Sequence, residues 1–399
     1  MHVMHVVGAR PNFMKAAPVF RAFAQETGMS QTLVHTGQHY DVNMSDVFFQ
    51  ELAVPEPDVN LRVGSGSHAQ QTGEVMIRLE PVIIERNPDW VLVYGDVNST
   101  AAAAMVCSKL LVKVAHVEAG LRSFDRTMPE EINRLVTDQL ADLLFTPSQD
   151  GNDNLLREGV AAERIRLVGN VMIDTLVRLL PKARDYSRPD LPERYALVTM
   201  HRPSNVDDPA FLQDLLVTLR ELSSELPVIF PVHPRTRQRI ATMSLHEGMP
   251  SRLQLTDPLS YLEFLSLEAK ATVVITDSGG IQEETTFLHV PCITVRENTE
   301  RPITTTLGTN VLVGRDMRRL REEVGRILEG RHSRGEVPPL WDGKASLRIV
   351  QETLAAGQAD RRAGVLNAAG RVDPTREKDG SSPTFDRSNI QQSRRRLES

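Results

Sequence analysis

Three short segments in the first third of the chain place carboxylates where an acid or a base could act. GDVNST puts Asp96 after a short apolar run, VAHVEAG puts Glu118 after the next run, and MPEEINR puts Glu130 at the start of a helical pattern. Any one of these acids could simply belong to a helix-capping turn. Two acids at neighbouring strand tips are harder to explain in that way, because their mutual repulsion raises one pKa and suits proton transfer.

Basic side chains lie close to these acids in the sequence. GARPNFMK follows the first apolar run, so Arg10 could offer its planar fork to a phosphate or carboxylate, and Lys15 would lie about one turn into a helix. Arg134 follows Glu130 by four residues and would share its helix face. The alternative is that these are solvated surface cations. No G-x-G-x-x-G follows the first run, so a dinucleotide fingerprint is unsupported.

The second half of the chain carries a predicted anion site. In VVITDSGGIQEE an apolar run is followed by Ser278, Gly279 and Gly280 and then a helix, whose first amides would point at a diphosphate. Glu284 lies within that helix, where a carboxylate can accept hydrogen bonds from ribose hydroxyls. His201 follows another apolar run and is a candidate phosphate ligand. The alternative for the glycines is an ordinary helix cap with acids favourable to the dipole.

Short apolar runs alternate with amphipathic stretches, which indicates βα units around parallel sheets. We expect strands at 3–7, 33–35, 90–94, 114–117 and 143–145, and then at 195–200, 228–231, 253–255, 273–276 and 292–295. Helices are expected at 69–85, 99–111, 130–141, 210–223, 260–267, 281–288 and 318–328.

This alternation predicts an α/β protein with two doubly wound Rossmann-like domains that face a cleft. The N-terminal domain, with the acids, would span 1–170 and the C-terminal domain, with the glycines, 171–357, its last helix possibly packing on the first. The segment 182–192 is rich in proline and charge and is interpreted as a linker or entry loop. Residues 358–399 lose the apolar periodicity and are expected to form a disordered polar tail.

Composition restricts the class of protein. The 399 residues are 40% hydrophobic and 25% charged, with a net charge of −6, which is average for a globular protein and argues against a nucleic-acid or membrane-surface binder. Cys107 and Cys292 lie in apolar surroundings and suggest neither a disulfide framework nor a zinc site. We expect a cytoplasmic protein, because no apolar run approaches the ~20 residues that span a bilayer.

Taken in order, these segments resemble the non-hydrolysing UDP-N-acetylglucosamine 2-epimerases of bacteria and archaea. The resemblance extends from residue 1 to about 355 and also includes TGQHYDVNMSDVFF, GNVMIDTL and RENTERP. It implies the two-domain architecture of the GT-B glycosyltransferases, a homodimer, a UDP-sugar substrate and no metal or redox cofactor. It also implies that UDP-N-acetylglucosamine is epimerised to UDP-N-acetylmannosamine through elimination of UDP and its re-addition to a 2-acetamidoglucal, for polysaccharide biosynthesis.

The resemblance assigns roles residue by residue. It places the catalytic groups on Asp96, Glu118, Glu130 and His201. It places diphosphate, ribose and sugar contacts on Arg10, Lys15, Arg134, Ser278, Gly279, Gly280 and Glu284.

Two segments depart from the family pattern. Many members have Arg-Arg-Glu after the histidine, where this chain has Arg202-Pro203-Ser204. Members that are activated by UDP-N-acetylglucosamine carry QHR-x-M, where this chain has Tyr40 and Asp41, so activation by substrate is not expected. The QHYD form also occurs in relatives that act on a UDP-2,3-diacetamido uronic acid. That sugar, a GT-B glycosyltransferase, a hydrolysing relative and a nucleotide-sugar sensor are the alternatives.

Overall fold

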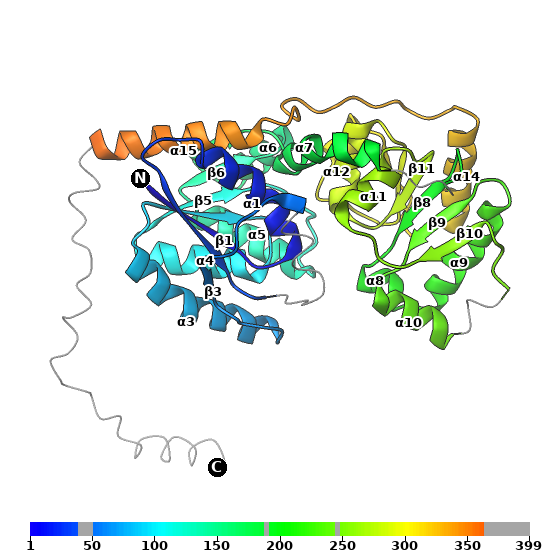
Figure 1. Cartoon of the computed structure of the whole chain (residues 1–399), viewed down its shortest axis with the longest axis horizontal. Coiled ribbons are helices and arrows are strands. Elements are labelled where there is room, and N and C mark those ends of the chain that lie inside the picture. The colour runs from blue at the N-terminus through cyan, green and yellow to red at the C-terminus, as the bar shows by residue number, and fades with distance from the viewer. Residues whose placement is uncertain (39–50, 187–190, 244–247, 363–399) are drawn as a thin grey trace, which may run out of the picture. The chain divides into compact units, whose positions relative to one another are not determined.

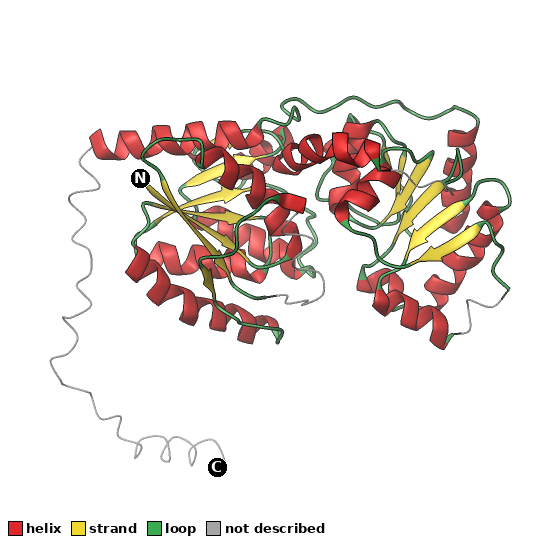
Figure 2. Ribbon diagram, viewed as in Figure 1, coloured by secondary structure: helices red, strands yellow, loops and turns green. Residues whose placement is uncertain are grey.

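The computed structural model describes residues 1–38, 51–186, 191–243 and 248–362, and within them the chain forms two parallel β-sheets, each covered by helices (Figures 1 and 2). Tyr40 and Asp41 lie outside these residues, as does most of the expected polar tail. No helix among the described residues is long and apolar enough to cross a membrane.

The first sheet has the strand order β3-β2-β1-β4-β5-β6-β7, with every neighbouring pair parallel. Its strands are β1 (His2–Val7), β2 (Ser30–His35), β3 (Val59–Asn60), β4 (Trp90–Tyr94), β5 (Lys113–Val117), β6 (Leu143–Thr146) and β7 (Ile165–Leu167). Side chains alternate between its two apolar layers: Val3 and Val7 enter one core, while Met4 and Val6 enter the other. Both faces are therefore buried, as parallel sheets require.

Helices cover both faces of this sheet. They are α1 (Arg10–Phe23), α3 (His68–Arg86), α4 (Asn98–Lys109), α5 (Pro129–Leu140) and α6 (Gln149–Arg157). Leu79 and Ile83 of α3 pack with Ala103 and Val106 of α4 in one core. Phe13 of α1 packs in the other core.

The second sheet has the order β10-β9-β8-β11-β12-β13, again with all pairs parallel. Its strands are β8 (Ala196–Thr199), β9 (Val228–Pro231), β10 (Leu253–Thr256), β11 (Val273–Thr276), β12 (Cys292–Thr294) and β13 (Asn310–Leu312). Its helices are α8 (Pro203–Val206), α9 (Pro209–Ser223), α10 (Pro234–Thr242), α11 (Tyr261–Glu268), α12 (Gly279–Leu288), α13 (Ile303–Thr306) and α14 (Met317–Leu328). The expectation of two doubly wound α/β sheets is confirmed.

The strand order reverses once in each sheet, and these reversals fix where a ligand can bind. The first sheet reverses between β1 and β4, and the second between β8 and β11. Neighbouring connections then leave in opposite directions, so a crevice opens at the carboxyl ends of those strands. The segments that follow these four strands hold Arg10, Asp96, His201 and Ser278.

The helix α7 (Val171–Asp185) corrects one sequence expectation. Residues 182–185 were assigned to a loop because of proline and charge, but they are the last residues of α7, which continues past Pro181. The helix continues because Leu179 and Ala183 are buried on one side of it. It packs against α1 of the first sheet and against α11 and α12 of the second, and Thr175 donates a hydrogen bond to the Met14 carbonyl.

The helix α15 (Ala345–Arg362) returns to the first sheet after the second sheet is complete (Figure 1). Ala345, Ile349 and Val350 are buried in the same core as Val3. The Asp174 carboxylate of α7 accepts hydrogen bonds from the first backbone amides of α15, at 3.0 and 2.7 Å. Thus α7 caps the helix that covers the first sheet.

Candidate functional site

The turn after β1 is held by a side chain from the helix that follows it. The Asn12 carboxamide oxygen accepts hydrogen bonds from the amides of Gly8 and Ala9, both at 3.0 Å, and its nitrogen donates to the Tyr94 carbonyl. A Cβ at Gly8 would lie 2.3 Å from the Ser99 hydroxyl oxygen, so only glycine allows α4 to approach this closely. The turn therefore fixes the start of α1, and with it Arg10 and Lys15.

Lys15 and Glu118 meet at the carboxyl end of the first sheet. The Lys15 ammonium crosses the turn after β4, where a Cβ at Gly95 would lie 2.7 Å from Nζ, and ends 2.8 Å from Glu118 Oε2. Both side chains are buried. Glu118 has φ of +74°, a left-handed conformation that costs a non-glycine residue roughly 1–3 kcal/mol. The surrounding structure thus holds this carboxylate in a strained position.

Asp96 is held by Arg134. The Arg134 guanidinium donates to Asp96 Oδ2 through Nε at 3.0 Å and Nη2 at 2.6 Å. Burial would raise the pKa of the Asp96 carboxyl, but the positive charges of Arg134, Lys15 and Arg301 outweigh burial and lower that pKa below its ordinary value. Asp96 is therefore an anion at neutral pH.

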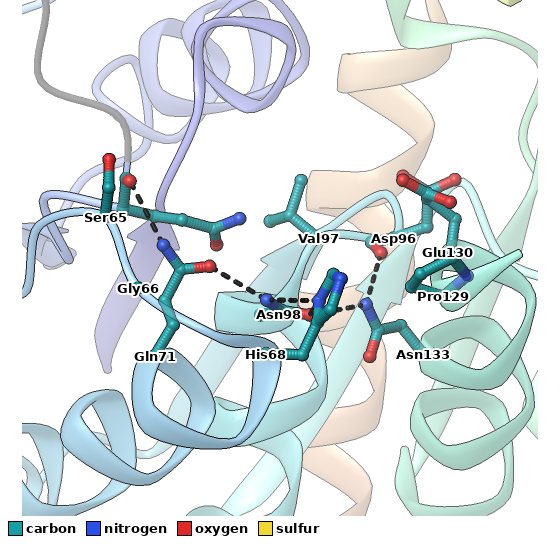
Figure 3. Close-up of a pocket in the computed structure, with 11 residues that line it drawn as sticks. Ser65, Gly66, His68, Gln71, Asp96, Val97, Asn98, Pro129, Glu130 and Asn133 are labelled. Atoms are coloured by element: carbon teal, nitrogen blue, oxygen red, sulfur yellow. Dashed lines mark hydrogen bonds between the residues drawn. The ribbon is translucent and has the colours of Figure 1, made fainter. Parts of the chain in front are cut away.

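The two glutamates that open α5 have different surroundings. Glu131 is buried and accepts hydrogen bonds from the Ser123 amide and hydroxyl and from the Phe124 amide, so it secures the preceding loop. Glu130 is half-buried and lines a pocket of about 240 Å³ together with Asp96 (Figure 3). Of the pair, Glu130 is thus the one that faces a space for a ligand.

That pocket is lined mainly by polar side chains. Asn98 lies at its centre and donates to the Gln71 side-chain oxygen at 2.8 Å and to His68 Nδ1 at 3.1 Å (Figure 3). Asn133 donates to the Asp96 carbonyl at 2.9 Å and to the Asn98 side-chain oxygen at 3.2 Å. Such a wall of amides, imidazole and carboxylates suits a hydroxylated ligand.

His201 follows β8, and its partner follows the neighbouring strand β11. The buried Asp277 carboxylate accepts hydrogen bonds from the backbone amides of His201 and Arg202 and from the Asn205 side chain. His201 Nδ1 lies 3.1 Å from Asp277 Oδ1, and about half of the imidazole is exposed. Burial opposes ionisation of Asp277, but these donors outweigh burial and lower its pKa. Asp277 therefore orients the imidazole through Nδ1, and the exposed part of the ring can contact an anion.

The glycine turn forms the N-terminus of α12. Ser278 is the residue before the first turn, and its hydroxyl does not cap the helix. Gly279 and Gly280 occupy the first turn, where backbone amides have no partner within the helix. A Cβ at Gly279 would lie 2.5 Å from Arg301 Nη1, so glycine is required for the guanidinium to pass here. An amide cluster beside an arginine suits a phosphate.

Arg301 links the two sheets and was not singled out in the sequence. Its Nη2 lies 3.2 Å from Glu118 Oε1 and its Nε lies 2.9 Å from Glu283 Oε1. Glu300, also not singled out, is buried and accepts two hydrogen bonds of 2.8 Å from Arg296. Both belong to the RENTERP segment, whose position directly after β12 was the signal that could have identified them.

Glu284 lies deeper in α12 among other acidic and phenolic groups. Its Oε1 accepts a 2.7 Å hydrogen bond from the Tyr261 hydroxyl. Burial raises the pKa of Glu284 to about 7, although the hydrogen bond from Tyr261 and the interaction with Glu268 oppose that rise. Arg10 interacts electrostatically with Tyr261. The residues assigned to the diphosphate and ribose thus come from both sheets.

The polar residues that follow β9 have structural partners instead. His233 is the N-cap of α10, where its Nδ1 accepts a hydrogen bond from the Arg235 amide. Arg235 itself pairs with Asp207. Among the described residues, no group of three or more histidine, cysteine or acidic side chains is arranged to hold a metal ion.

Comparison with known proteins gives close relatives along nearly the whole chain. The model of the UDP-N-acetylglucosamine 2-epimerase family matches residues 21–354. A UDP-N-acetylglucosamine 2-epimerase of Methanocaldococcus jannaschii is 41% identical over 362 residues, which are 88% of this chain and 98% of that protein. A UDP-2,3-diacetamido-2,3-dideoxy-D-glucuronate 2-epimerase of Pseudomonas aeruginosa is 42% identical over 356 residues, 88% of this chain and 99% of that protein.

Solved structures give the same result. The crystal structure of the M. jannaschii enzyme with UDP-GlcNAc and UDP superposes with a TM-score of 0.82 at 41% identity, covering 89% of this chain and all of that one. The lipopolysaccharide outer core galactosyltransferase WaaB superposes with a TM-score of 0.53 at 14% identity, over 88% of this chain and all of that one. The second likeness concerns the fold alone, and the two together confirm the GT-B architecture.

Proposed function

This chain belongs to the UDP-N-acetylglucosamine 2-epimerase family and is an isomerase, and from that premise we propose that it inverts C2 of UDP-N-acetylglucosamine without hydrolysing it. The product would be UDP-N-acetylmannosamine. One observation carries the proposal: Glu118 from the first sheet contacts Lys15 on one side and Arg301 of the second sheet on the other. A carboxylate is thereby placed beside the cations that a departing diphosphate needs.

The reaction consists of an elimination and its reversal. A carboxylate takes the proton from C2 while the C1–O bond breaks and the electron pair leaves with UDP, giving a 2-acetamidoglucal. An acid then returns a proton to C2 from the opposite face, and UDP re-adds at C1. Two acid–base groups on opposite faces of the ring are required, together with charge stabilisation of UDP.

The geometry supports a division of these roles between the sheets. We assign proton transfer to Asp96, Glu118 and Glu130, because all three lie at the carboxyl end of the first sheet and the lowered pKa of Asp96 makes it available as a base. Lys15 and Arg134 position these acids through ion pairs.

Binding of UDP is assigned to the second sheet and one residue of the first. Arg10, His201 and the amides of Ser278, Gly279 and Gly280 would hold the diphosphate. Glu284 would accept hydrogen bonds from the ribose. Arg301 would stabilise the negative charge that develops on the diphosphate as it leaves, because Arg301 lies between α12 and Glu118.

A second candidate substrate is UDP-2,3-diacetamido glucuronate. The relative named for that sugar is as similar to this chain, at 42% identity, as the relative named for N-acetylglucosamine, at 41%. The same carboxylates and the same UDP contacts would serve both, because the two sugars differ at C3 and C6 and the chemistry occurs at C1 and C2.

We also propose the organisation of the protein that the family resemblance implies. Residues 1–170 would supply the acid–base groups and 171–357 the UDP contacts. Residues 358–362 of the expected polar tail form the end of α15, so the proposed tail begins at 363. The active form would be a cytoplasmic homodimer that requires no cofactor.

Incubation with each UDP-sugar in deuterium oxide, followed by proton NMR, tests the reaction. Deuterium at C2 of an intact UDP-sugar, with the C2 epimer appearing, is the expected result. The sugar that exchanges faster identifies the substrate. Release of free N-acetylmannosamine would instead indicate a hydrolysing enzyme, and an unchanged sugar would favour a glycosyltransferase or a sensor.

A further inference from the structure

A second carboxyl group lies behind the one assigned to the ribose. Glu268 is the last residue of α11, is fully buried, and interacts with Glu284 of α12. Among the described residues, neither oxygen of Glu268 has a hydrogen-bond donor. A buried carboxylate without a donor is very unfavourable, and the C-terminal end of a helix disfavours negative charge further. Glu268 therefore carries a proton.

The partners of the two acids decide which of them donates. Glu284 already accepts a hydrogen bond from the Tyr261 hydroxyl at 2.7 Å, so it acts as an acceptor. The Glu268 proton has no hydrogen-bond acceptor among the described residues other than Glu284, so Glu268 is the donor of the pair. Two buried acids that interact in this way share one proton and carry one negative charge.

Other charged groups near the pair do not replace that proton. Tyr261 interacts with Glu284 and with Arg10, and the buried Cys292 thiol of β12 interacts electrostatically with Glu268. From α7, the carboxylate of Asp174 is bound to the amides that begin α15. Arg178, also from α7, donates to the Glu51 carbonyl.

We propose that Glu268 is a positioning residue that donates a hydrogen bond to Glu284 and so fixes this carboxylate to accept the ribose hydroxyls of the nucleotide. The inference rests on the proposed UDP site, because it needs Glu284 to contact the ribose. It gives nucleotide binding a pH dependence: loss of the shared proton places two negative charges in one buried site, and Glu284 is then pushed out of position.

Two substitutions separate donation from packing. Glu268→Gln keeps the size of the side chain and a hydrogen-bond donor but cannot ionise. Glu268→Leu keeps the approximate size but removes the donor. Ser266→Ala, on the same helix but directed at the Glu263 carbonyl, is the control. UDP affinity is measured by titration calorimetry from pH 6 to 8.5, and the melting temperature of the free protein from pH 5 to 8.5.

At pH 6.5 we expect Glu268→Gln and Ser266→Ala to bind UDP within about twofold of the wild type. Glu268→Leu should bind about tenfold more weakly or worse, the usual effect of losing a hydrogen bond to a charged group. As pH rises, the wild type should lose affinity relative to Glu268→Gln. Equal affinity of Glu268→Leu and wild type, or parallel pH curves for Glu268→Gln and wild type, would overturn the proposal.

Thermal stability distinguishes this proposal from the proposed function. The raised pKa of Glu268 means that the folded state binds its proton more tightly, so this group stabilises the fold at low pH and loses that contribution as pH rises. The melting temperature of Glu268→Gln minus that of the wild type should therefore increase as the pH rises from 5 to 8.5. A wild type that does not bind UDP would refute the proposed function, while an unchanged difference in melting temperature would refute the shared proton.

Discussion

The two sheets use the same kind of side chain in opposite ways at their switch points. Beside the first sheet, Asp96 and Glu118 contact guanidinium and ammonium groups at 2.6–3.2 Å. Beside the second sheet, Glu284 and Glu268 face a tyrosine hydroxyl and each other, and burial raises the pKa of both. The cationic neighbours of Asp96 lower its pKa and keep it charged, whereas we infer that the Glu284–Glu268 pair, which has no such neighbours, shares one proton.

The contrast between Asp96 and Glu284 shows that the charged partners of a buried carboxyl, together with its burial, set its pKa. Glu283 is an intermediate case, because it is buried 2.9 Å from Arg301 and yet burial raises its pKa to about 7. Charged carboxylates suit proton abstraction, and a proton-sharing pair suits the recognition of a neutral ribose.

The largest effect is expected for the charged carboxylates. Asp96→Asn, Glu118→Gln and Glu130→Gln should each slow epimerisation by about 10²-fold or more, the usual range for a general acid or base. UDP affinity should stay within a few-fold, because none of the three needs to contact UDP. The C2 deuterium-exchange rate and titration with UDP measure the two effects. Wild-type exchange in both Asp96→Asn and Glu118→Gln would refute the acid–base assignment.

A suitable control for these variants is Glu74→Gln. Glu74 is a half-exposed residue of α3 that pairs with Arg78, so its substitution removes the same charge outside the site. Its rate should match that of the wild type.

On the side that shares a proton, Glu284→Ala should raise KM for the UDP-sugar about tenfold and change kcat by only a few-fold. A ribose contact has the same strength in the ground and transition states, so its loss appears as weaker binding. His201→Ala, in contrast, should lower both UDP affinity and turnover, because a diphosphate ligand also stabilises the leaving group. Steady-state kinetics of both variants decide this. A large fall in kcat of Glu284→Ala at constant KM would contradict the ribose role.

A smaller effect, on the pH profile, is expected for Arg134→Gln. The Arg134 charge helps to lower the pKa of Asp96, so its removal raises that pKa and the base is protonated at higher pH. The acidic limb of the kcat/KM profile should move up by about one pH unit, since a unit corresponds to about 1.4 kcal/mol of lost interaction.

Arg134→Lys is the matched variant, because it keeps the charge and should leave the limb nearly in place. The melting temperature of both variants shows whether Glu131, which also pairs with Arg134, still holds its loop. Coincident acidic limbs for Arg134→Gln and Arg134→Lys would show that charge does not set the pKa of Asp96.

The carboxylates beside both sheets should be unaffected by the removal of residues 363–399. Between Arg371 and Ser399 the sequence has few apolar residues and a run of three arginines at 394–396, so we expect it to add too little buried surface to affect the folded part. Activity should be unchanged and the melting temperature should move by less than about 2 °C. Removal of residues 344–399 is the contrasting truncation, because it deletes the buried Ile349 and should lower the melting temperature strongly. A loss of several degrees in the shorter truncation would contradict this prediction.

Much of the site could be predicted from the sequence, because parallel sheets place chemistry directly after strands. Asp96, Glu118 and Ser278 were found in this way, since each follows a clear apolar run. Arg301 follows a strand of only three residues, and its importance appears only when it reaches Glu118 from the other sheet.

Other features depend on packing that no local pattern encodes. Proline and charge predicted a loop at 182–185, but burial of Ala183 against neighbouring helices keeps that segment helical. Glu268 resembles any acid at the end of an amphipathic helix, and only the approach of α12 makes it a partner of Glu284. Sequence patterns report neighbours along the chain, whereas these two residues are determined by neighbours in space.

The return of α15 to the first sheet has a consequence for biosynthesis. Ile349 and Val350 complete the core that Val3 begins, although almost the whole chain separates them. Translation produces the N-terminal part first, so the part of this core that α15 covers stays exposed until the second sheet has been made. We expect this transiently exposed apolar surface to be a target for chaperones during translation. A fragment that ends near residue 170 would keep it permanently exposed and is therefore expected to aggregate.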